Sequence, residues 1–504
     1  TPLIAAQAVQ ILWEAGIPQD VLQLLPGQGE SIGAQLSADS RIQGIMFTGS
    51  TEVAHILQKT VAERLNQFGE SVTLIAETGG QNAMIVDSSA LTEQVVLDVV
   101  NSAYDSAGQR CSALRVLCVQ EDNLDAVRTM LKGAMQQLRV GNPILLKTDI
   151  GPVIDLEAQQ NIQTHIQQMR NKGHKVHQLM FNQDETELTQ GTFIPPTLIE
   201  LPNLNDLERE VFGPVLHLIS YKYGELEQLL EQINSKGYGL TMGLHTRIDE
   251  TIQTVIARAE VGNLYINRNI VGAVVGVQPF GGEGLSGTGP KAGGPLYIYR
   301  LMQQLSEKKL AQPYAMRSDQ APIEHKPVQE FKAWASKTFP TISLKAPSQI
   351  ATGQSFSLQG PTGEENQYMI LPRESVLSLA HTEQDQIQQI LAILSVGSRP
   401  AVLAENTFVL KYLQTMPKAV AARFKVIQDI ESGEFDAVLH HGDAAELIDL
   451  QKRIAARKGP IVGITHLNSG NHDIPVERLV LERAISINTA AAGGNASLMT
   501  MSHL

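Results

Sequence analysis

The sequence contains few cysteines and few aromatic residues. Among its 504 residues are two cysteines, and phenylalanine, tyrosine and tryptophan together make up 5% of the chain. So few cysteines exclude a framework of disulfide bonds and are typical of proteins in a reducing compartment. We therefore expect a cytoplasmic location.

Long hydrophobic runs and basic patches are also missing. No apolar stretch approaches the roughly 20 residues that a transmembrane helix needs. The formal net charge is −13, and no segment rich in lysine and arginine is interleaved with aromatic residues, which argues against a nucleic-acid partner. The length predicts two to four domains, and we expect a soluble protein without a transmembrane segment.

The sequence does contain an alternation of helical and strand patterns. Residues 1–16 have the periodicity of an amphipathic helix, as do residues 48–65. Apolar runs at 21–25, 42–47 and 71–80 are typical of strands. Strands separated by helices imply right-handed crossovers and a parallel α/β sheet. Because the chain opens on a helix with no strand before it, we expect it to be a piece of a longer polypeptide.

Cys111 lies in the stretch AYDSAGQRCSALRVL, surrounded by small residues. A lone cysteine is most often a packed core residue. Small neighbours such as Gly108 and Ser112, however, leave room for a substrate and let backbone amides approach a developing oxyanion. Arg110 is expected to favour the thiolate. Cys118 sits in the apolar run VLCV and is assigned to the core, so Cys111 is the candidate nucleophile.

A nucleophilic thiol needs a partner that moves protons. No histidine lies close to Cys111 in the sequence, which weakens a Cys-His protease interpretation. Glu77 ends the expected strand at 71–80 and is followed by Thr-Gly-Gly. A carboxylate at that position is a candidate for the base that activates water.

The stretch FTGST at residues 47–51 joins a strand to a helix. Free backbone N–H groups beside Gly49 and Ser50 would suit a pyrophosphate, although a simple helix cap is the alternative.

The sequence GEGLSG at 282–287 matches the pattern G-x-G-x-x-G. It precedes no helix, so it is rejected as a dinucleotide fingerprint and is interpreted as a close-approach loop.

Five ordered motifs resemble the aldehyde dehydrogenase superfamily over residues 1–305. They are FTGST, ETGGQNA with Glu77, GQRCSA with Cys111, EVFGPVL at 210–216 and PFGGEGLSGTG at 279–289. The stretches AGQRCSALR and GLSGTGPKAGGPLY are similar to Δ1-pyrroline-5-carboxylate dehydrogenase, as found in the bifunctional proline utilization A family. The resemblance implies an α/β aldehyde dehydrogenase fold with a Rossmann-like parallel sheet in an NAD-binding domain, incomplete at its N-terminus, and an α/β catalytic domain.

The resemblance also implies a reaction. Cys111 would attack glutamate 5-semialdehyde to form a thiohemiacetal, hydride transfer to NAD⁺ would leave a thioester, and Glu77 would activate the water that releases glutamate. An aldehyde dehydrogenase of other substrate range is the first alternative. An inactive scaffold or lid and a regulatory nucleotide-binding module are the others.

The same resemblance assigns individual residues. Gly49 and Ser50 would bind the cofactor pyrophosphate, and Glu210 would hold the nicotinamide ribose with Phe212 beside it. A surface carboxylate and a core aromatic ring are the alternatives for Glu210 and Phe212. The substrate would contact Ser112, Phe280, Ser286, Gly287 and Thr288.

Two residues of the family pattern have no counterpart in the sequence. They are the oxyanion asparagine and the lysine that holds the adenosine ribose, which would lie upstream of Thr1. The resemblance therefore implies that this chain alone binds NAD⁺ poorly and oxidises aldehyde slowly.

The part that follows residue 310 resembles a degenerate copy of the first. The segment at 435–458 echoes QGIMFTGSTEVAHILQKTVAERL, and RAISINTA at 483–490 mirrors GNLYINRN at 262–269. This second copy has no cysteine and no glutamate in the place of Glu77. The spacing of its histidines matches no common metal-ligand pattern, so no metal site is expected at His440, His441, His466 or His472.

These observations divide the chain into segments. The remainder of an NAD-binding domain is followed by a catalytic domain, an anchor loop with a return segment, a linker, a degenerate aldehyde-dehydrogenase-like domain and a C-terminal tail. Their expected bounds are, in that order, 1–76, 77–275, 276–310, 311–344, 345–485 and 486–504. The tail would be a lid over the route between two active sites, as the resemblance to longer members of the proline utilization A family implies.

The resemblance implies partners as well. An upstream proline dehydrogenase domain with FAD would belong to the same polypeptide, outside this chain, and could associate peripherally with a membrane. A small-molecule substrate and a homo-oligomer are expected, with TFIPPTLIEL at 192–201 as one pairing edge.

Overall fold

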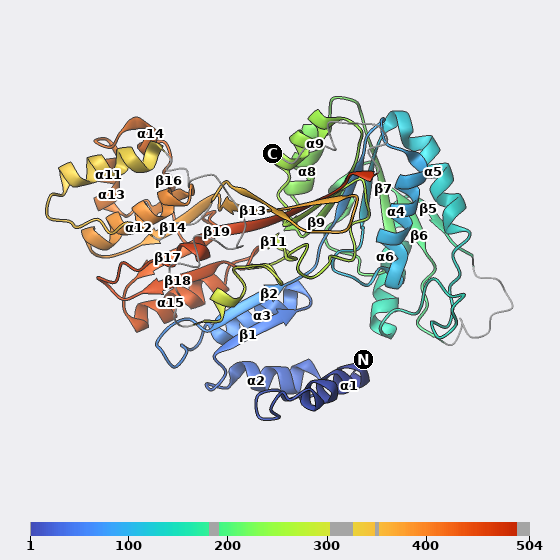
Figure 1. Cartoon of the computed structure of the whole chain (residues 1–504), viewed down its shortest axis with the longest axis horizontal. Helices are drawn as coiled ribbons and strands as arrows, with labels where there is room; N and C mark the ends of the chain where they lie inside the picture. Colours follow the sequence, from blue (N-terminus) through green and yellow to red (C-terminus); the bar gives the residue numbers. More distant parts are fainter. Residues whose placement is uncertain (1, 181–190, 303–325, 348–351, 491–504) are drawn as a thin grey trace.

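The computed structural model describes residues 2–180, 191–302, 326–347 and 352–490. Figure 1 shows two α/β units side by side, linked by the long strands β13 and β19, with the N-terminal helices below them. Within these described ranges, no helix combines the length and the apolar character needed to cross a membrane.

The N-terminal segment contains two paired strands and few buried side chains. β1 and β2 pair in parallel, with Thr48 opposite Glu77. The strand expected at 21–25 is wrong, because these residues form a turn and a loop in which Val21 and Leu25 are 75% and 57% exposed and no neighbouring strand pairs with them. The elements are α1 (Pro2–Glu14), the π-helix η1 (Gly29–Gly33), α2 (Ala34–Ala38), β1 (Gly44–Thr48), α3 (Thr51–Val61) and β2 (Thr73–Glu77).

A sheet of ten strands forms the core of the first unit. Its order is β12-β13-β19-β10-β9-β3-β4-β7-β6-β5, and the strands from β19 to β6 run parallel. Central strands are apolar on both faces because helices cover both sides. The strands are β3 (Ala83–Val86), β4 (Val116–Gln120), β5 (Lys175–Gln178), β6 (Thr197–Glu200), β7 (Val215–Tyr221), β9 (Thr241–His245), β10 (Asn263–Ile266), β12 (Ser355–Leu358), β13 (Glu364–Pro372) and β19 (Val480–Asn488).

Helices with one apolar stripe supply the layers around this sheet. In α4, for example, Val95 and Val99 are fully buried against the strands. The short strands β8 (Tyr238–Gly239) and β11 (Glu283–Gly284) pair with each other outside the main sheet. The helices are α4 (Thr92–Tyr104), α5 (Glu121–Met135), α6 (Leu156–Asn171), α8 (Leu226–Asn234) and α9 (Asp249–Arg258), with single turns η2 (Asp105–Gly108), η3 (Leu204–Asp206) and η4 (Ile298–Arg300).

The second unit is a parallel sheet of five strands in the order β16-β15-β14-β17-β18. Its strands are β14 (Ser375–Leu379), β15 (Arg399–Leu403), β16 (Lys425–Ile427), β17 (Ala437–His441) and β18 (Gly463–Leu467). Its helices are α11 (Lys326–Thr338), α12 (Glu383–Ser395), α13 (Thr407–Leu413), α14 (Lys418–Ala421) and α15 (Ala444–Ala455), followed by the turn η5 (Val476–Leu479).

Two of the bounds expected from the sequence fall inside strands, 76/77 in β2 and 485/486 in β19, and the expected linker contains a helix. The stretch at 311–344 contains α11, whose Phe331 is fully buried in the core of the second unit. The boundary between 485 and 486 lies within β19. Residues 491–504, the rest of the expected tail, lie outside the described residues.

The sequence echo corresponds to matching structure. β1 and β17 each have five residues and precede a helix capped by Ser50 or Asp443. β2 and β18 follow, and Leu467 opposite His441 takes the place that Glu77 has opposite Thr48. The two helices, α3 and α15, also lie against each other (Figure 1).

Candidate active site

Glu77 is the last residue of β2, and a loop is fixed to the end of this strand. The Thr78 N–H donates to the Ser286 carbonyl at 2.9 Å, and the Thr288 N–H donates to the Ala76 carbonyl at 2.9 Å. Gly287 forms an antiparallel bridge with Glu77. The glycine-rich loop is therefore a wall of the site around the carboxylate.

The Glu77 carboxylate sits in a glycine cradle. Oε2 accepts the Gly282 N–H at 3.0 Å, whereas Oε1 is buried without a hydrogen-bond partner among the described residues. A Cβ at Gly281 or Gly287 would lie 3.0 Å from a carboxylate oxygen, so a side chain at either position would crowd the carboxylate. Burial raises the pKa of Glu77 above its usual range, against the opposing effects of the Gly282 N–H and the Lys291 charge. A carboxyl group with a raised pKa is suited to accept a proton near neutral pH.

Cys111 follows a tight backbone turn and is partly exposed. Ser106 and Ala107 in this turn both have φ of 54°. The Asn82 amide donates to the carbonyl oxygens of Cys111 and Ala113 at 2.7 and 2.9 Å, which fixes the backbone around the thiol.

Burial is the largest cause that raises the pKa of the Cys111 thiol, followed by the negative charges of Glu210 and Glu77. The expectation that Arg110 favours the thiolate is therefore wrong for this structure. The Arg110 guanidinium lies 2.9 Å from the Asp105 carboxylate instead. Glu77 is thus one of the charges that act on the Cys111 thiol.

Glu210 lies beside the Gly79-Gly80 backbone that follows β2 and is held by a buried arginine. Arg115, 1% exposed, donates to Oε1 of Glu210 at 2.9 Å, and the Gly80 N–H donates to Oε2 at 3.1 Å. The guanidinium lies 5.2 Å from the ring centre of Phe212, which is 44% exposed. A Cβ at Gly79 would lie 2.1 Å from Glu210 Oε2, so the strand end and this carboxylate approach closely.

Gly49 and Ser50 lie at the exposed N-terminus of α3. The Ser50 hydroxyl accepts the Val53 N–H at 3.2 Å and so caps the helix. The Gly49 N–H donates to the Glu77 carbonyl at 3.1 Å. This helix end, with the partial positive charge of its first turn, therefore lies beside the strand that carries the candidate base.

The candidate substrate residues are placed around the same loop. Ser286 is fully buried and its hydroxyl accepts the Gly239 N–H at 3.1 Å, while the Thr288 hydroxyl accepts the Ala76 N–H at 3.0 Å. Ser112 is 6% exposed, beside Cys111. The backbone of Phe280 pairs with Ala292, and its side chain is half-buried. The Ser286 and Thr288 hydroxyls thus bond to the protein backbone in this structure.

Sequence reasoning missed three residues that organise the site: Asn82, Arg115 and Lys291. Each lies inside one of the quoted stretches ETGGQNA, AGQRCSALR and GLSGTGPKAGG. Asn82 and Arg115 are neither nucleophiles nor bases by residue type, and nothing in the pattern marks Lys291 as buried. A buried arginine or lysine must be paired, and this signal could have identified Arg115 and Lys291 once burial was known.

The histidines of the second unit bond mainly to each other and to local groups. His440 and His466 approach within 3.0 Å through their Nδ1 atoms, and His472 lies 2.8 Å from Asp385. His441 contacts Gln389. In the part of the chain that the structure describes, no three His, Cys, Asp or Glu side chains are grouped so that they could hold a metal ion.

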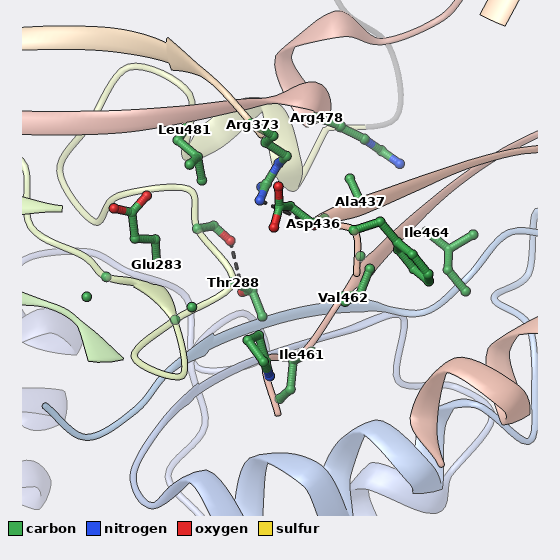
Figure 2. Close-up of a pocket in the computed structure, with 18 of the residues that line it drawn as sticks. Glu283, Thr288, Arg373, Asp436, Ala437, Ile461, Val462, Ile464, Arg478 and Leu481 are labelled. Carbon is green, nitrogen blue, oxygen red and sulfur yellow. Dashed lines mark hydrogen bonds between the residues drawn. The ribbon is translucent and has the colours of Figure 1, made fainter. Parts of the chain in front are cut away.

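A cavity of about 750 Å³ lies between the two units. Figure 2 shows Glu283 and Thr288 on one side of it and Asp436 and Ala437 on the other. The outer face of the glycine-rich loop therefore borders open space rather than a packed core.

The aldehyde dehydrogenase family model matches residues 1–306. Among curated relatives, "Bifunctional protein PutA" of Escherichia coli (strain K12) is 52% identical over 514 residues, which cover 99% of this chain and 39% of that protein. "1-pyrroline-5-carboxylate dehydrogenase" of Geobacillus kaustophilus (strain HTA426) is 36% identical over 306 residues, 60% of this chain and 58% of that protein. The chain thus spans well under half the length of the PutA relative.

Solved structures give a consistent result. Proline Utilization A (PutA) from Corynebacterium freiburgense has a TM-score of 0.69 at 25% identity, over 96% of this chain and 46% of that chain. A 1-pyrroline-5-carboxylate dehydrogenase from Thermus with bound NAD has a TM-score of 0.54 at 36% identity, over 59% of this chain and 57% of that chain. The α/β fold expected from the motifs is confirmed, and the chain belongs to the aldehyde dehydrogenase family.

Proposed function

We propose that this chain carries the aldehyde-oxidising part of a bifunctional enzyme of proline catabolism and converts glutamate 5-semialdehyde to glutamate. The observation that carries the proposal is the placement of Glu77, in a glycine cradle and within the electrostatic reach of the partly exposed Cys111 thiol. Similarity to PutA and to 1-pyrroline-5-carboxylate dehydrogenases supports the substrate class.

The chemistry proceeds through the Cys111 sulfur. The thiolate attacks the aldehyde carbon, and a C–S bond forms as the carbonyl becomes an oxyanion. Loss of hydride from that carbon restores the carbonyl as a thioester. Glu77 then takes a proton from water, the hydroxide adds to the thioester carbon, and the C–S bond breaks to release the carboxylate and the thiol.

The residues present fit NAD, which would accept the hydride when bound. The exposed N-terminus of α3 with Gly49 and Ser50 would hold the pyrophosphate. Glu210 is anchored by Arg115 and Gly80, so it would present its carboxylate to a ribose in a fixed position, and the exposed ring of Phe212 would pack beside it.

Substrate selection would depend on the loop at 285–288 and on Ser112. The Gly287 backbone bridges to Glu77, so a substrate carboxylate that binds to this loop would lie close to the candidate base. Phe280 would flank the aldehyde. Oxidation of a wider range of aldehydes is the alternative function, since most of the contacts proposed between the substrate and this loop involve backbone groups.

Several features of the complete enzyme belong to this proposal. An upstream proline dehydrogenase domain with FAD would supply the substrate, and the complete protein would be cytoplasmic, peripherally membrane-associated and homo-oligomeric. Because β1 and β2 form only a two-stranded sheet, we also infer that this chain alone binds NAD⁺ poorly.

The experiment is a trap of the acyl-enzyme in the full-length polypeptide. Glu77→Gln is mixed with glutamate 5-semialdehyde and NAD⁺, and the intact protein is weighed by mass spectrometry. We expect an added glutamyl mass on Cys111 that Cys111→Ser abolishes and that the matched control Cys118→Ser retains. Full NADH formation by Cys111→Ser would contradict the proposal. Faster oxidation of unrelated aldehydes would favour the alternative substrate range.

A further inference from the structure

A chain of hydrogen bonds connects β13 and β19, the strands that link the two α/β units, to the glycine-rich loop. Tyr368 on β13 donates its hydroxyl hydrogen to Glu482 Oε1 at 2.7 Å. Glu482, on β19, accepts the Lys291 backbone N–H through Oε2 at 2.8 Å. A carboxylate from strands that connect to the second unit therefore binds the end of the loop that surrounds Glu77.

Lys291 continues this connection toward the candidate base. Its Nζ donates to the Gly281 carbonyl and to Asn263 Oδ1, both at 2.6 Å. The next residue, Gly282, donates the one hydrogen bond that the structure gives the Glu77 carboxylate. The path from Glu482 to Glu77 thus passes through Lys291 and the Gly281-Gly282 peptide.

One side of the loop borders a cavity. The cavity between the two units borders Gly282, Thr288 and Lys291. Figure 2 shows Glu283 and Thr288 facing this space, with Leu481 and Arg373 across from them. Hydrogen bonds from several segments hold the rest of the loop, at the end of β2, around β8 and at Asn263. The bond from the Lys291 N–H to Glu482 holds the Lys291 end of the loop.

We propose that Glu482 is a positioning residue for Glu77, so that strand β19 supports the hydrolysis of the acyl-enzyme and not only the fold. The proposal rests on the proposed function, in which Glu77 activates the water that releases the acyl group. Glu482 does not touch the reacting atoms. It acts by fixing Lys291 and, through Lys291, the peptide that binds the Glu77 carboxylate.

The test separates the two halves of the reaction in the full-length polypeptide. Stopped-flow absorbance of NADH, with glutamate 5-semialdehyde and NAD⁺, gives a first-turnover phase for thioester formation and a steady-state phase that includes hydrolysis. In Glu482→Ala we expect the first phase to persist and the steady-state rate to fall about 10- to 100-fold, since a small misplacement of a catalytic group has an effect of this size.

Two further variants show whether the effect is specific. Glu482→Gln keeps an acceptor for the Lys291 N–H, so we expect it to restore the steady-state rate to within about twofold of wild type. Glu364→Ala is the matched control, because it removes the partner of Arg268 from the far end of the same strand pair. We expect Glu364→Ala to leave the ratio of the two phases unchanged.

Three results would overturn the proposal. In Glu482→Ala these are an equal fall in the rates of both phases or an unchanged steady-state rate. In Glu364→Ala it is a fall in the steady-state rate with the first phase retained. If Glu482→Ala does not fold, Glu482→Asp replaces it, because the shorter side chain withdraws the acceptor from Lys291. A wild-type enzyme that forms no Cys111 thioester would contradict the proposed function. If the wild-type enzyme forms the thioester but the Glu482 variants show no selective loss of the steady-state rate, only the role of Glu482 is contradicted.

Discussion

At the scale of single residues, the candidate base and nucleophile were accessible from the sequence, and the groups that hold them were not. Glu77 at a strand end and Cys111 among small residues have local patterns. Glu482 and Tyr368 carry no such pattern, because their contacts with Lys291 and with each other join segments far apart in the chain. Residue type and local spacing contain no information about such contacts.

The reactivity of Cys111 should respond to the charge of Glu77. A nearby negative charge disfavours the thiolate, so it raises the pKa of the thiol, and its removal should lower that pKa. Burial raises the pKa of Glu77 to about 8, so its negative charge is present only above that pH. In Glu77→Gln we therefore expect alkylation of Cys111 by iodoacetamide at about pH 9 to become faster, by up to about tenfold for a shift of one pKa unit. Mass spectrometry of the labelled peptides measures this rate.

Two controls accompany this measurement. Cys118 is fully buried, and burial raises its pKa to about 12, so it should stay unlabelled in each variant. Glu231→Gln removes a carboxylate from the exposed face of α8 and should leave the rate for Cys111 unchanged. A slower or unchanged rate in Glu77→Gln would show that the two side chains do not interact.

At the scale of elements, local periodicity predicted most helices and strands that it addressed. The strands at 42–47 and 71–80 correspond to β1 and β2. The strand predicted at 21–25 was wrong, because an apolar run becomes a strand only where a neighbouring strand can pair with it. The order of the ten-stranded sheet could not be predicted either, since β19 joins β10 from the other end of the sequence.

Strand β19 should be essential for the first unit as well as for the second. It pairs with β10 on one side and β13 on the other, and Ile485 lies in its centre, 1% exposed. Ile485→Pro removes a backbone N–H from the interior of the sheet, and an unmet buried hydrogen bond costs about 1–3 kcal/mol. We expect a lower free energy of unfolding in urea, with faster hydrogen exchange of the amides of β10.

The matched substitution Ile485→Val keeps the N–H group. It should cost only about 0.5–1.5 kcal/mol and should leave the exchange of β10 slow. Protected β10 amides in Ile485→Pro would mean that the first unit does not depend on this strand.

At the scale of the whole molecule, the structure contains the same strand-helix-strand arrangement twice. The paired strands share one register, and Leu467 stands where the first copy has Glu77. The sequence predicted the repeat and the missing carboxylate. It could not predict that β10 and β19, the other mirrored segments, pair with each other in matching register, with Ile266 opposite Ile487.

The two tryptophans of the chain should report different stabilities in the two parts of the molecule. Trp13 lies on α1, a helix with no buried residue, whereas Trp334 packs among Phe331, Phe339 and Tyr412 of the second unit. Segments with few buried contacts open at low free-energy cost. We expect the fluorescence of Trp13 in this chain to change at lower urea than that of Trp334.

The variants Trp334→Phe and Trp13→Phe each leave one tryptophan and give the two transitions separately. Superimposable urea transitions would show that α1 unfolds together with the second unit.

The contribution of β13 and β19 to the sheet also bears on aggregation. A bare edge at β10 would offer unpaired N–H and C=O groups to other chains, and such edges promote intermolecular strand addition. With these strands in place, the sheet ends instead at β12 and β5, each four residues long and antiparallel to its neighbour. A version of the first unit made without them would be expected to precipitate during expression.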